Sequence, residues 1–374
     1  NLRQGTIQFL CLDPYSYGEE QTIEFQSDSV IIENKGTAET EPIFELTAKE
    51  PTTFAMVSNG DEYMMVGKPF DINQIPVEQY PEVQRWRMDS LVGWSHMTEG
   101  FLLDDEVSGG IVSGSSIVTT GSAFTPSSYG SNRSGWYGPA LRASLPESIG
   151  DFSITLGVQA NNDGKGRGKV MAIFLDEQDK IVCSMGLINS RLGTRNMRVL
   201  ARLNDGNNIR RRRVFDYPGD SGPNSTVFSN RPLNIRLRRE GNTFEAYTWQ
   251  VRDGIQHARH RETIIDDNPD FQRPIRQVVL FFAKYGNNPV FPMYISGLRV
   301  NKSNALTEEE IPYIAMPDDE IIFDHKTGDC YVNGEPVPFD FGADFFTLKK
   351  GVNNLTVLPE NTFETSVKYR ERYK

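Results

Sequence analysis

Short runs of alternating hydrophobic and polar residues fill most of the chain, and turn-forming residues separate them. Near the beginning, strand-like runs occupy residues 43–48, 54–57 and 62–66, and the Asn-Gly-Asp at 59–61 is typical of a tight hairpin turn. The one acidic capping pattern typical of a helix start, at 307–310, is cut short by Pro312. The pattern therefore predicts an all-β protein.

A longer β-rich block occupies the middle of the chain. Clusters of Gly, Asn and Asp separate its strand-like runs, which are residues 152–159, 169–176, 180–187, 197–202, 233–238, 243–250, 278–284 and 293–300. So many short strands within about 150 residues are typical of an antiparallel β-sandwich.

The end of the chain has the same pattern of short strand-like runs and turns as its beginning. Strand-like runs cover residues 320–324, 330–332, 355–358 and 362–369, with turns expected at 326–329, 333–334 and 351–354. We expect these runs to form one domain together with those of the first 76 residues.

Charge divides the chain at the same places. Residues 77–306 hold 28 Lys and Arg against 23 Asp and Glu, a net charge of +5, and Arg dominates their basic residues. The remaining residues carry −16, and the whole chain carries −11. Such asymmetry indicates a separate module. The sequence therefore predicts a β-sandwich formed by residues 1–76 and 307–374, interrupted at 77–306 by an inserted jelly-roll or lectin-like sandwich.

Composition excludes several classes of site. No apolar run reaches the length of about 18 residues that a membrane-spanning helix needs. Cys11, Cys183 and Cys330 are far apart and lack metal-site spacing, so we expect buried free thiols, with Cys11 and Cys330 as possible neighbours in space. We expect no metal, although a Ca²⁺ ion in the insert stays an alternative.

Motifs for catalysis are also missing. There is no GxSxG elbow, and the nearest pair of carboxylates for a glycosidase, Asp176 and Asp179, falls at an expected turn. The sequence therefore favours a protein that is not an enzyme, with a polysaccharide hydrolase as the weaker alternative.

Four consecutive arginines, Arg210, Arg211, Arg212 and Arg213, are the first binding candidates. In a strand they alternate, two on each face, and on an exposed edge they discourage pairing with another chain. Alternatively they bind an anionic polymer, because guanidinium grips phosphate or carboxylate in a bidentate manner. Nucleic acid is the least favoured partner, since no known binding motif accompanies the run and the chain is acidic.

Aromatic residues are the second set of binding candidates, because their rings stack on sugar faces while polar neighbours bind the hydroxyls. Tyr247 and Trp249 share one strand face, and one aromatic pair is expected to fill a core. Trp136 and Tyr137 follow a Ser- and Gly-rich stretch, which favours them as the exposed pair. The residues concerned are Asn132, Arg133, Trp136, Tyr137, Tyr247 and Trp249.

Several motifs in the two flanks of the insert, residues 1–76 and 307–374, resemble those of one family. Residues 13–18 (Asp-Pro-Tyr-Ser-Tyr-Gly) resemble the signature that opens the C-terminal galectin-like domain of siphophage distal tail proteins. Asn34-Lys35-Gly36-Thr37 with Pro42, and the final Tyr369-Arg370-Glu371-Arg372-Tyr373, are similar to further motifs of that domain. The resemblance covers about 140 residues and implies a galectin-like domain into which family members insert carbohydrate-binding modules.

The resemblance implies a place and a set of partners for the chain. It implies a baseplate component of the virion tail tip, made in the host cytoplasm, whose insert binds host cell-wall polysaccharide during adsorption. Implied protein partners are the major tail protein and a tail-associated lysin or receptor-binding protein. The N-terminal domain that builds the family's hexameric ring is not found here, so we expect hexamers only with that domain. The alternative is a structural baseplate protein whose insert contacts other proteins.

Overall fold

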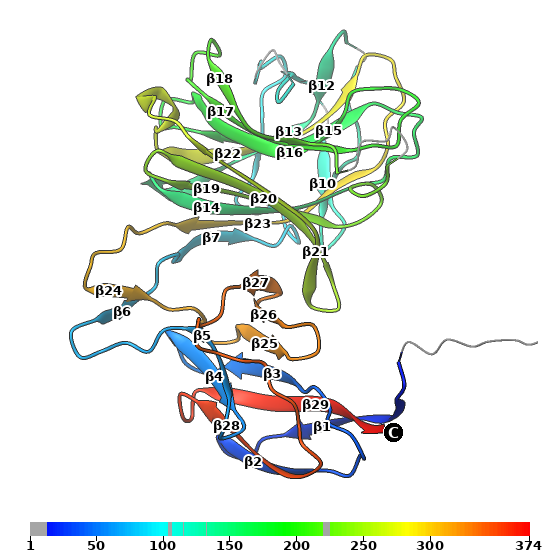
Figure 1. Ribbon diagram of the computed structural model, residues 1–374. Helices are drawn as coiled ribbons and strands as arrows, with labels where there is room; N and C mark the ends of the chain where they lie inside the picture. The colour runs from blue at the N-terminus through cyan, green and yellow to red at the C-terminus, as the bar shows by residue number, and fades with distance from the viewer. Residues whose placement is uncertain (1–12, 104–106, 115, 132, 220–224) are drawn as a thin grey trace, which may run out of the picture. The chain divides into compact units, whose positions relative to one another are not determined.

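The computed structural model describes residues 13–103, 107–114, 116–131, 133–219 and 225–374. Within these ranges the chain forms strands β1 to β29 and one 3-10 turn, η1 (Pro269–Phe271), and contains no α-helix (Figure 1). The predicted all-β fold is confirmed. No helix of the described residues is long and apolar enough to cross a membrane.

The chain divides into two compact units. Unit 1 comprises Asn1–Val77 and Leu306–Lys374, and unit 2 comprises Glu78–Ala305. Each boundary lies one residue from the position that charge and strand patterning predict.

Unit 1 is built from sheets that both flanks of the chain share. In its described part, the six-stranded sheet has the order β1 (Ser16–Glu24), β29 (Phe363–Tyr373), β3 (Ile43–Ala48), β25 (Glu320–Asp324), β26 (Asp329–Val332) and β27 (Glu335–Val337). The four-stranded sheet has the order β2 (Ser29–Asn34), β28 (Gly351–Leu358), β4 (Phe54–Ser58) and β5 (Tyr63–Gly67). A short parallel pair joins β6 (Ile75–Val77) to β24 (Glu310–Pro312).

The core of unit 1 lies between these sheets and contains residues of both flanks, such as Phe44 and Leu46 from β3 and Phe323 from β25, all fully buried. Alternation produces this arrangement, because every second residue of β3 points to the same face. The expected turn at 351–354 is wrong: β28 already begins at Gly351, since Val352 pairs with Glu33 of β2.

Motif residues of the two flanks contact each other. The Asn34 side-chain amide donates to the backbone oxygens of Ala38 and Leu348, both at 3.1 Å. A Cβ on Gly36 would lie 2.6 Å from the backbone oxygen of Arg372, so only glycine fits this approach. Residues over 300 positions apart in the chain therefore complete one structure.

Unit 2 is a sandwich of two larger sheets (Figure 1). Its described eight-stranded sheet has the order β10 (Ile117–Thr119), β11 (Phe124–Pro126), β23 (Met293–Lys302), β14 (Phe152–Ala160), β19 (Leu233–Glu240), β20 (Thr243–Arg252) and β21 (Ile255–Ile265), with β7 (Glu82–Trp86) paired to β23.

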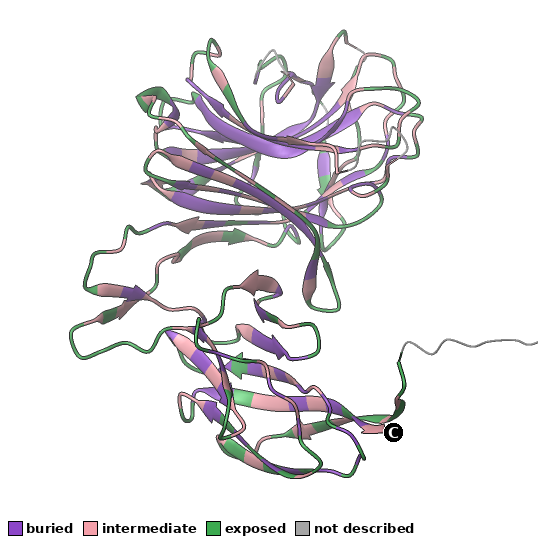
Figure 2. Cartoon of the chain, in the orientation of Figure 1, coloured by how far each residue is buried: buried purple, intermediate pink, exposed green. Residues whose placement is uncertain are grey.

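The described nine-stranded sheet of unit 2 has the order β18 (Arg211–Tyr217), β17 (Arg198–Asn204), β16 (Ile181–Asn189), β15 (Gly168–Leu175), β22 (Ile275–Tyr285), β12 (Trp136–Gly138) and β9 (Ile111–Val112), with β13 (Ala140–Ile149) also on β22 and β8 (Ser95–His96) on β13. Side chains between the two sheets form the main core, including Phe174, Phe244 and Phe282, each fully buried. Buried residues, purple in Figure 2, occupy long stretches of the strands of both sheets. Cys183 in this core and Cys330 in unit 1 are buried free thiols, whereas Cys11 lies outside the described residues.

The two chain segments that lead into and out of unit 2 are bonded to each other. The Asn304 N–H donates to the Gln79 oxygen at 2.9 Å.

We expect a chain in which Asn-Gly replaces residues 80–303 to fold as unit 1, because two-residue turns join neighbouring antiparallel strands and the unit 1 core uses flank residues alone. Far-UV circular dichroism and cooperative thermal unfolding test this. The same chain truncated after Glu360, which lacks β29, is the control that should not fold, and an unfolded Asn-Gly chain would contradict the prediction.

A buried histidine makes unit 1 sensitive to acid. His325 packs among Phe44, Phe345 and Phe346, with ring centroids 5.4, 5.3 and 4.3 Å away. Burial lowers the pKa of His325 from 6.5 to about 4. The unfolded chain therefore takes up a proton at a higher pH than the folded one, and stability present above pH 6.5 is lost as pH falls towards 4, by up to about 3 kcal/mol.

Unfolding by urea at pH 7 and pH 4.5 checks this expectation. The four tryptophans lie in unit 2, so unit 1 gives the transition that circular dichroism detects and tryptophan fluorescence does not. His325→Phe should flatten the pH dependence of that transition, whereas His96→Gln at an exposed position should leave it unchanged. Equal pH dependence in the wild type and His325→Phe would refute the assignment.

Candidate functional site

The outer face of the nine-stranded sheet is unusual because it is apolar and covered. Successive residues of β15 alternate between the faces: Ala172 points towards the eight-stranded sheet, and Ile173 points away from it. On the outer side, Ile173 packs with Leu103 and Val112 in a second cluster of buried residues. Residues 97–103 and 107–114 therefore cover the middle of this face, and its two rims are candidate binding surfaces.

A buried lysine holds the covering segment in place. Lys169 on β15 is completely buried, and its Nζ donates to the backbone oxygens of Val107, at 2.7 Å, and Gly109. The same Nζ lies 4.6 Å from the Trp136 ring centroid. A buried charge needs such partners to offset its lost hydration. The sequence places Lys169 at the end of a Gly- and Lys-rich stretch, and only the fold reveals its role.

Aromatic rings and cations meet at one rim of the outer face. Trp136 on β12 is partly exposed and meets Tyr285 edge to face, with centroids 5.2 Å apart. The guanidinium of Arg167 lies over Tyr285 at 3.6 Å from the ring centroid, a cation–π contact. We call Trp136, Tyr285 and Arg167 the aromatic rim. Tyr285 and Arg167 were not predicted, because their approach depends on the pairing of β12 and of β15 with β22.

Other predicted members of this site lie apart from it. Tyr137 is fully buried and its hydroxyl donates to the Gly286 oxygen at 3.2 Å, so the expectation of an exposed Trp-Tyr pair is wrong. Strand alternation is the reason, because adjacent residues point to opposite faces. Arg133 is ion-paired with Glu99, and Asn132 lies outside the described residues.

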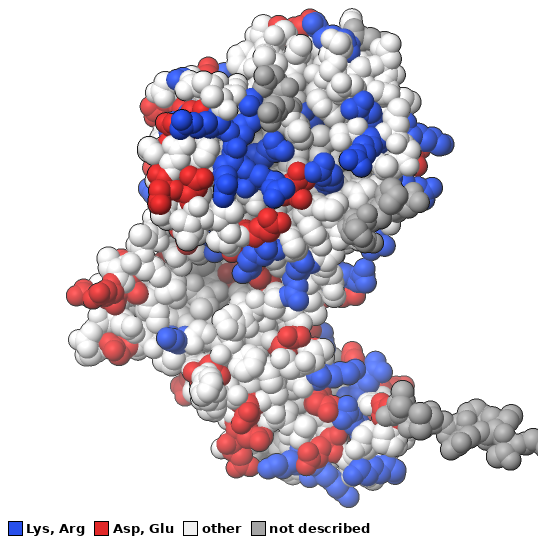
Figure 3. Space-filling view, turned by 45° about the horizontal axis from the view of Figure 1, so that its top comes forward, with Lys and Arg blue, Asp and Glu red and all other residues white. Residues whose placement is uncertain are grey.

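The second rim of the outer face carries arginines. Arg202 of β17 lies directly opposite Arg213 of the edge strand β18, and Asn204 lies opposite Arg211. These side chains point away from the core, since Leu203 between them on β17 belongs to it. We call Arg198, Arg202, Arg211 and Arg213 the arginine rim. Lys and Arg side chains gather on the face of unit 2 that is turned to the viewer in Figure 3.

The remaining arginines of the run have other surroundings. Arg212 points to the opposite face, where its Nε lies 3.6 Å from an Asp266 carboxylate oxygen. Arg210 precedes β18 in a turn, so the predicted distribution of two arginines on each face is wrong. Burial raises the pKa of Asp205, but backbone N–H groups, that of Arg210 first, outweigh it and bring the pKa below its ordinary value. An ionised Asp205 thus fixes the turn before β18.

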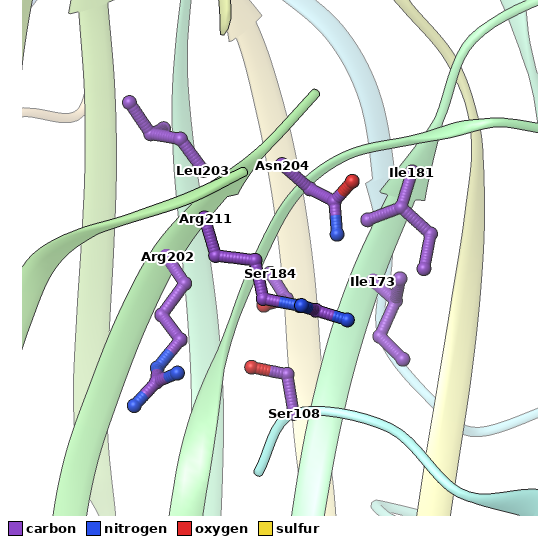
Figure 4. Close-up of a pocket in the computed structure, with 8 residues that line it drawn as sticks. All are labelled: Ser108, Ile173, Ile181, Ser184, Arg202, Leu203, Asn204 and Arg211. Atoms are coloured by element: carbon purple, nitrogen blue, oxygen red, sulfur yellow. The ribbon is translucent and has the colours of Figure 1, made fainter. Parts of the chain in front are cut away.

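A small pocket lies beside the arginine rim (Figure 4). In Figure 4 the Arg211 side chain extends across it above Ser108, towards Ile173 and Ile181, while Arg202 points away from its centre. The lining residues combine an apolar floor with hydroxyl, amide and guanidinium groups: Ser108, Ile173, Ile181, Ser184, Arg202, Leu203, Asn204 and Arg211. Arg198, further along β17, is ion-paired with Asp216 of β18.

Tyr247 and Trp249 share a face of β20, as predicted, but that face is the outer one of the eight-stranded sheet, because Phe244 and Ala246 point into the core. Their rings stack at 5.0 Å between centroids and are 3% and 8% exposed. The Arg236 guanidinium lies over Tyr247 at 5.0 Å. The pair therefore neither fills the sandwich core nor presents an open ring face.

The carboxylates considered for catalysis belong to a turn. Asp176 is buried, is ion-paired with Arg273 and accepts the Lys180 backbone N–H at 2.9 Å. Burial raises the pKa of Asp179, but hydrogen bonds from Gln277 and Arg142 outweigh it, so the pKa lies below its ordinary value. Within the described ranges, no group of three or more His, Cys, Asp or Glu is arranged to hold a metal ion.

Comparison with known proteins identifies part of the chain. Residues 289–373 match the family described as "Siphovirus-type tail component, C-terminal domain". The match begins just before β23 of unit 2 and continues through the C-terminal flank of unit 1. The resemblance to siphophage distal tail proteins is thereby confirmed for the C-terminal flank. No curated protein sequence matches the chain.

Solved structures similar to the chain are β-sandwiches. The CBM2 module of the evolved Dit of Lactobacillus casei BL23 phage J-1 is 13% identical, with a TM-score of 0.50, over 62% of this chain and all of that one. The laminarinase catalytic domain of Thermotoga maritima is 15% identical, with a TM-score of 0.40, over 61% of this chain and all of that one. A Bacillus licheniformis β-glucanase is 11% identical, with a TM-score of 0.38, over 59% and 98%. The first likeness shows the fold alone, and the other two carry no argument about activity.

Replacing Lys169 with Met tests its role as the anchor of the covering segment. We expect Lys169→Met to destabilise unit 2 by about 1–3 kcal/mol, because the Val107 and Gly109 oxygens lose their donor. Thermal unfolding followed by tryptophan fluorescence measures the change, and hydrogen exchange should increase in residues 107–112. The control is Lys165→Met, at a largely exposed position. If both variants unfold alike, Lys169 does not anchor the segment.

Proposed function

We propose that the chain is a siphovirus-type tail component, since residues 289–373 match the C-terminal domain of that family, and that its unit 2 binds host cell-wall polysaccharide during adsorption. As a tail component it would belong to the virion and interact with other tail proteins. Unit 1 is proposed as the scaffold that holds both ends of unit 2 at the tail tip. Unit 2 is then the part that meets the host surface.

The aromatic rim is the observation that carries the proposal. Trp136 is partly exposed, and its ring is fixed by Tyr285 and by Lys169 beneath it. A fixed ring loses little conformational entropy when a sugar stacks on it. Arg167 beside it offers donors to sugar hydroxyls. The sandwich fold that unit 2 shares with a phage Dit module called CBM2 supports the same proposal.

Assembly completes the proposed function. We propose the major tail protein and a tail-associated lysin or receptor-binding protein as partners, and a hexamer formed through an N-terminal ring domain. Several copies on one tail would raise avidity about 10²–10⁴-fold over one weak site. Binding is proposed to need no metal, so removal of Ca²⁺ with EDTA should leave it unchanged.

Retention by purified host cell walls tests the proposal. A tetramer of the biotinylated full chain on streptavidin should bind the walls, and Trp136→Ala should reduce binding about tenfold because the stacking face is lost. Trp136→Phe keeps an aromatic face and should retain most of the binding. Trp249→Phe, at a buried ring, should lower thermal stability and leave binding unchanged.

Two other outcomes would favour the rival functions. A folded tetramer that binds no host wall would exclude the polysaccharide proposal and favour a purely structural insert. Release of reducing sugars from the walls would favour a hydrolase.

A further inference from the structure

We propose that the arginine rim binds the anionic groups, phosphate or carboxylate, of a charged wall polysaccharide. This inference rests on the proposed function and names the class of ligand and a second contact surface on unit 2. The aromatic rim would meet sugar rings, and the arginine rim would meet charge.

The placement of the arginines is not explained by protection of a sheet edge. Arg213 lies on the edge strand β18, where a charge discourages pairing with another chain. Arg202 lies on β17, which is paired on both sides and needs no such protection. Moreover, Arg202 and Arg213 are directly opposite each other, so the two strands concentrate positive charge at one place on the outer face. An anionic group of a ligand placed there would meet both cations.

The surroundings of the rim suit an oxyanion on a sugar. Arg213 is exposed and forms no ion pair with any residue of the described ranges. Asn204 and Ser184 line the adjoining pocket together with Arg211. Guanidinium binds phosphate or carboxylate through two parallel N–H bonds, while amide and hydroxyl groups bind neighbouring sugar hydroxyls.

Charge favours this surface over the rest of the chain. Residues 77–306 carry +5 in a chain whose net charge is −11, so an anionic polymer is attracted to unit 2 and repelled elsewhere. Nucleic acid fits less well, because single strands need free aromatic faces for base stacking. Of the two rings on β18, Phe215 is fully buried, and Tyr217 is already stacked on His260 at 3.7 Å between centroids.

Binding of the full chain to defined polymers tests the inference. The probes are poly(glycerol phosphate) for phosphate, polygalacturonate for carboxylate, dextran as a neutral control and single-stranded DNA for the nucleic acid alternative. We expect tighter binding of one anionic polysaccharide than of dextran or DNA, weakened by salt. Arg202→Gln with Arg213→Gln should reduce the affinity about tenfold or more.

A matched variant separates the site from overall charge. Arg252→Gln with Arg259→Gln removes the same charge at exposed positions of the β20–β21 hairpin, and should change affinity less than twofold. Equal losses in both double variants, or tighter binding of DNA, would overturn the inference. If host walls still bind while the rim variant has no effect, the inference fails alone. If wild-type chain binds no wall, the proposed function fails.

Discussion

Pairing between strands from opposite ends of the chain is the constraint on which this structure depends. β3 of the N-terminal flank lies between β29 and β25, which both come from the C-terminal flank, and β28 likewise lies between β2 and β4. Neither flank has a complete sheet without the other. The backbone of one flank must therefore find the other across more than 200 intervening residues, and Gly36 permits its close approach to Arg372.

The same pairing leaves the intervening residues free to form their own domain. Their two ends are bonded to each other at Gln79 and Asn304. Unit 2 is therefore inserted at a position where a short turn could connect the two segments of unit 1. Its cores consist of unit 2 residues alone. An insertion of this kind changes what is presented to the surroundings without changing the sheets that hold it.

Within unit 2, the segment that covers one sheet face determines which side chains of that face a ligand can reach. The segment held by Lys169 buries the middle of the outer face. The candidate binding groups lie at two rims beside it, around Trp136 and around Arg213. These rims differ in character, since one offers a fixed ring and the other concentrated positive charge.

Local pattern determined most of the fold, whereas the candidate site depended on long-range pairing. Alternation and turn residues locate strands such as β3 and β25 because side-chain direction in a strand has a period of two residues. Charge asymmetry and the flank motifs locate the insertion. However, the sequence could not tell that Tyr137 is buried or that Trp249 lies outside the core, since alternation gives two faces without saying which one a second sheet covers. The sequence also could not show that Arg202 lies opposite Arg213 or that Lys169 donates a hydrogen bond to Val107. These contacts arise only when separate strands and a covering segment pack together.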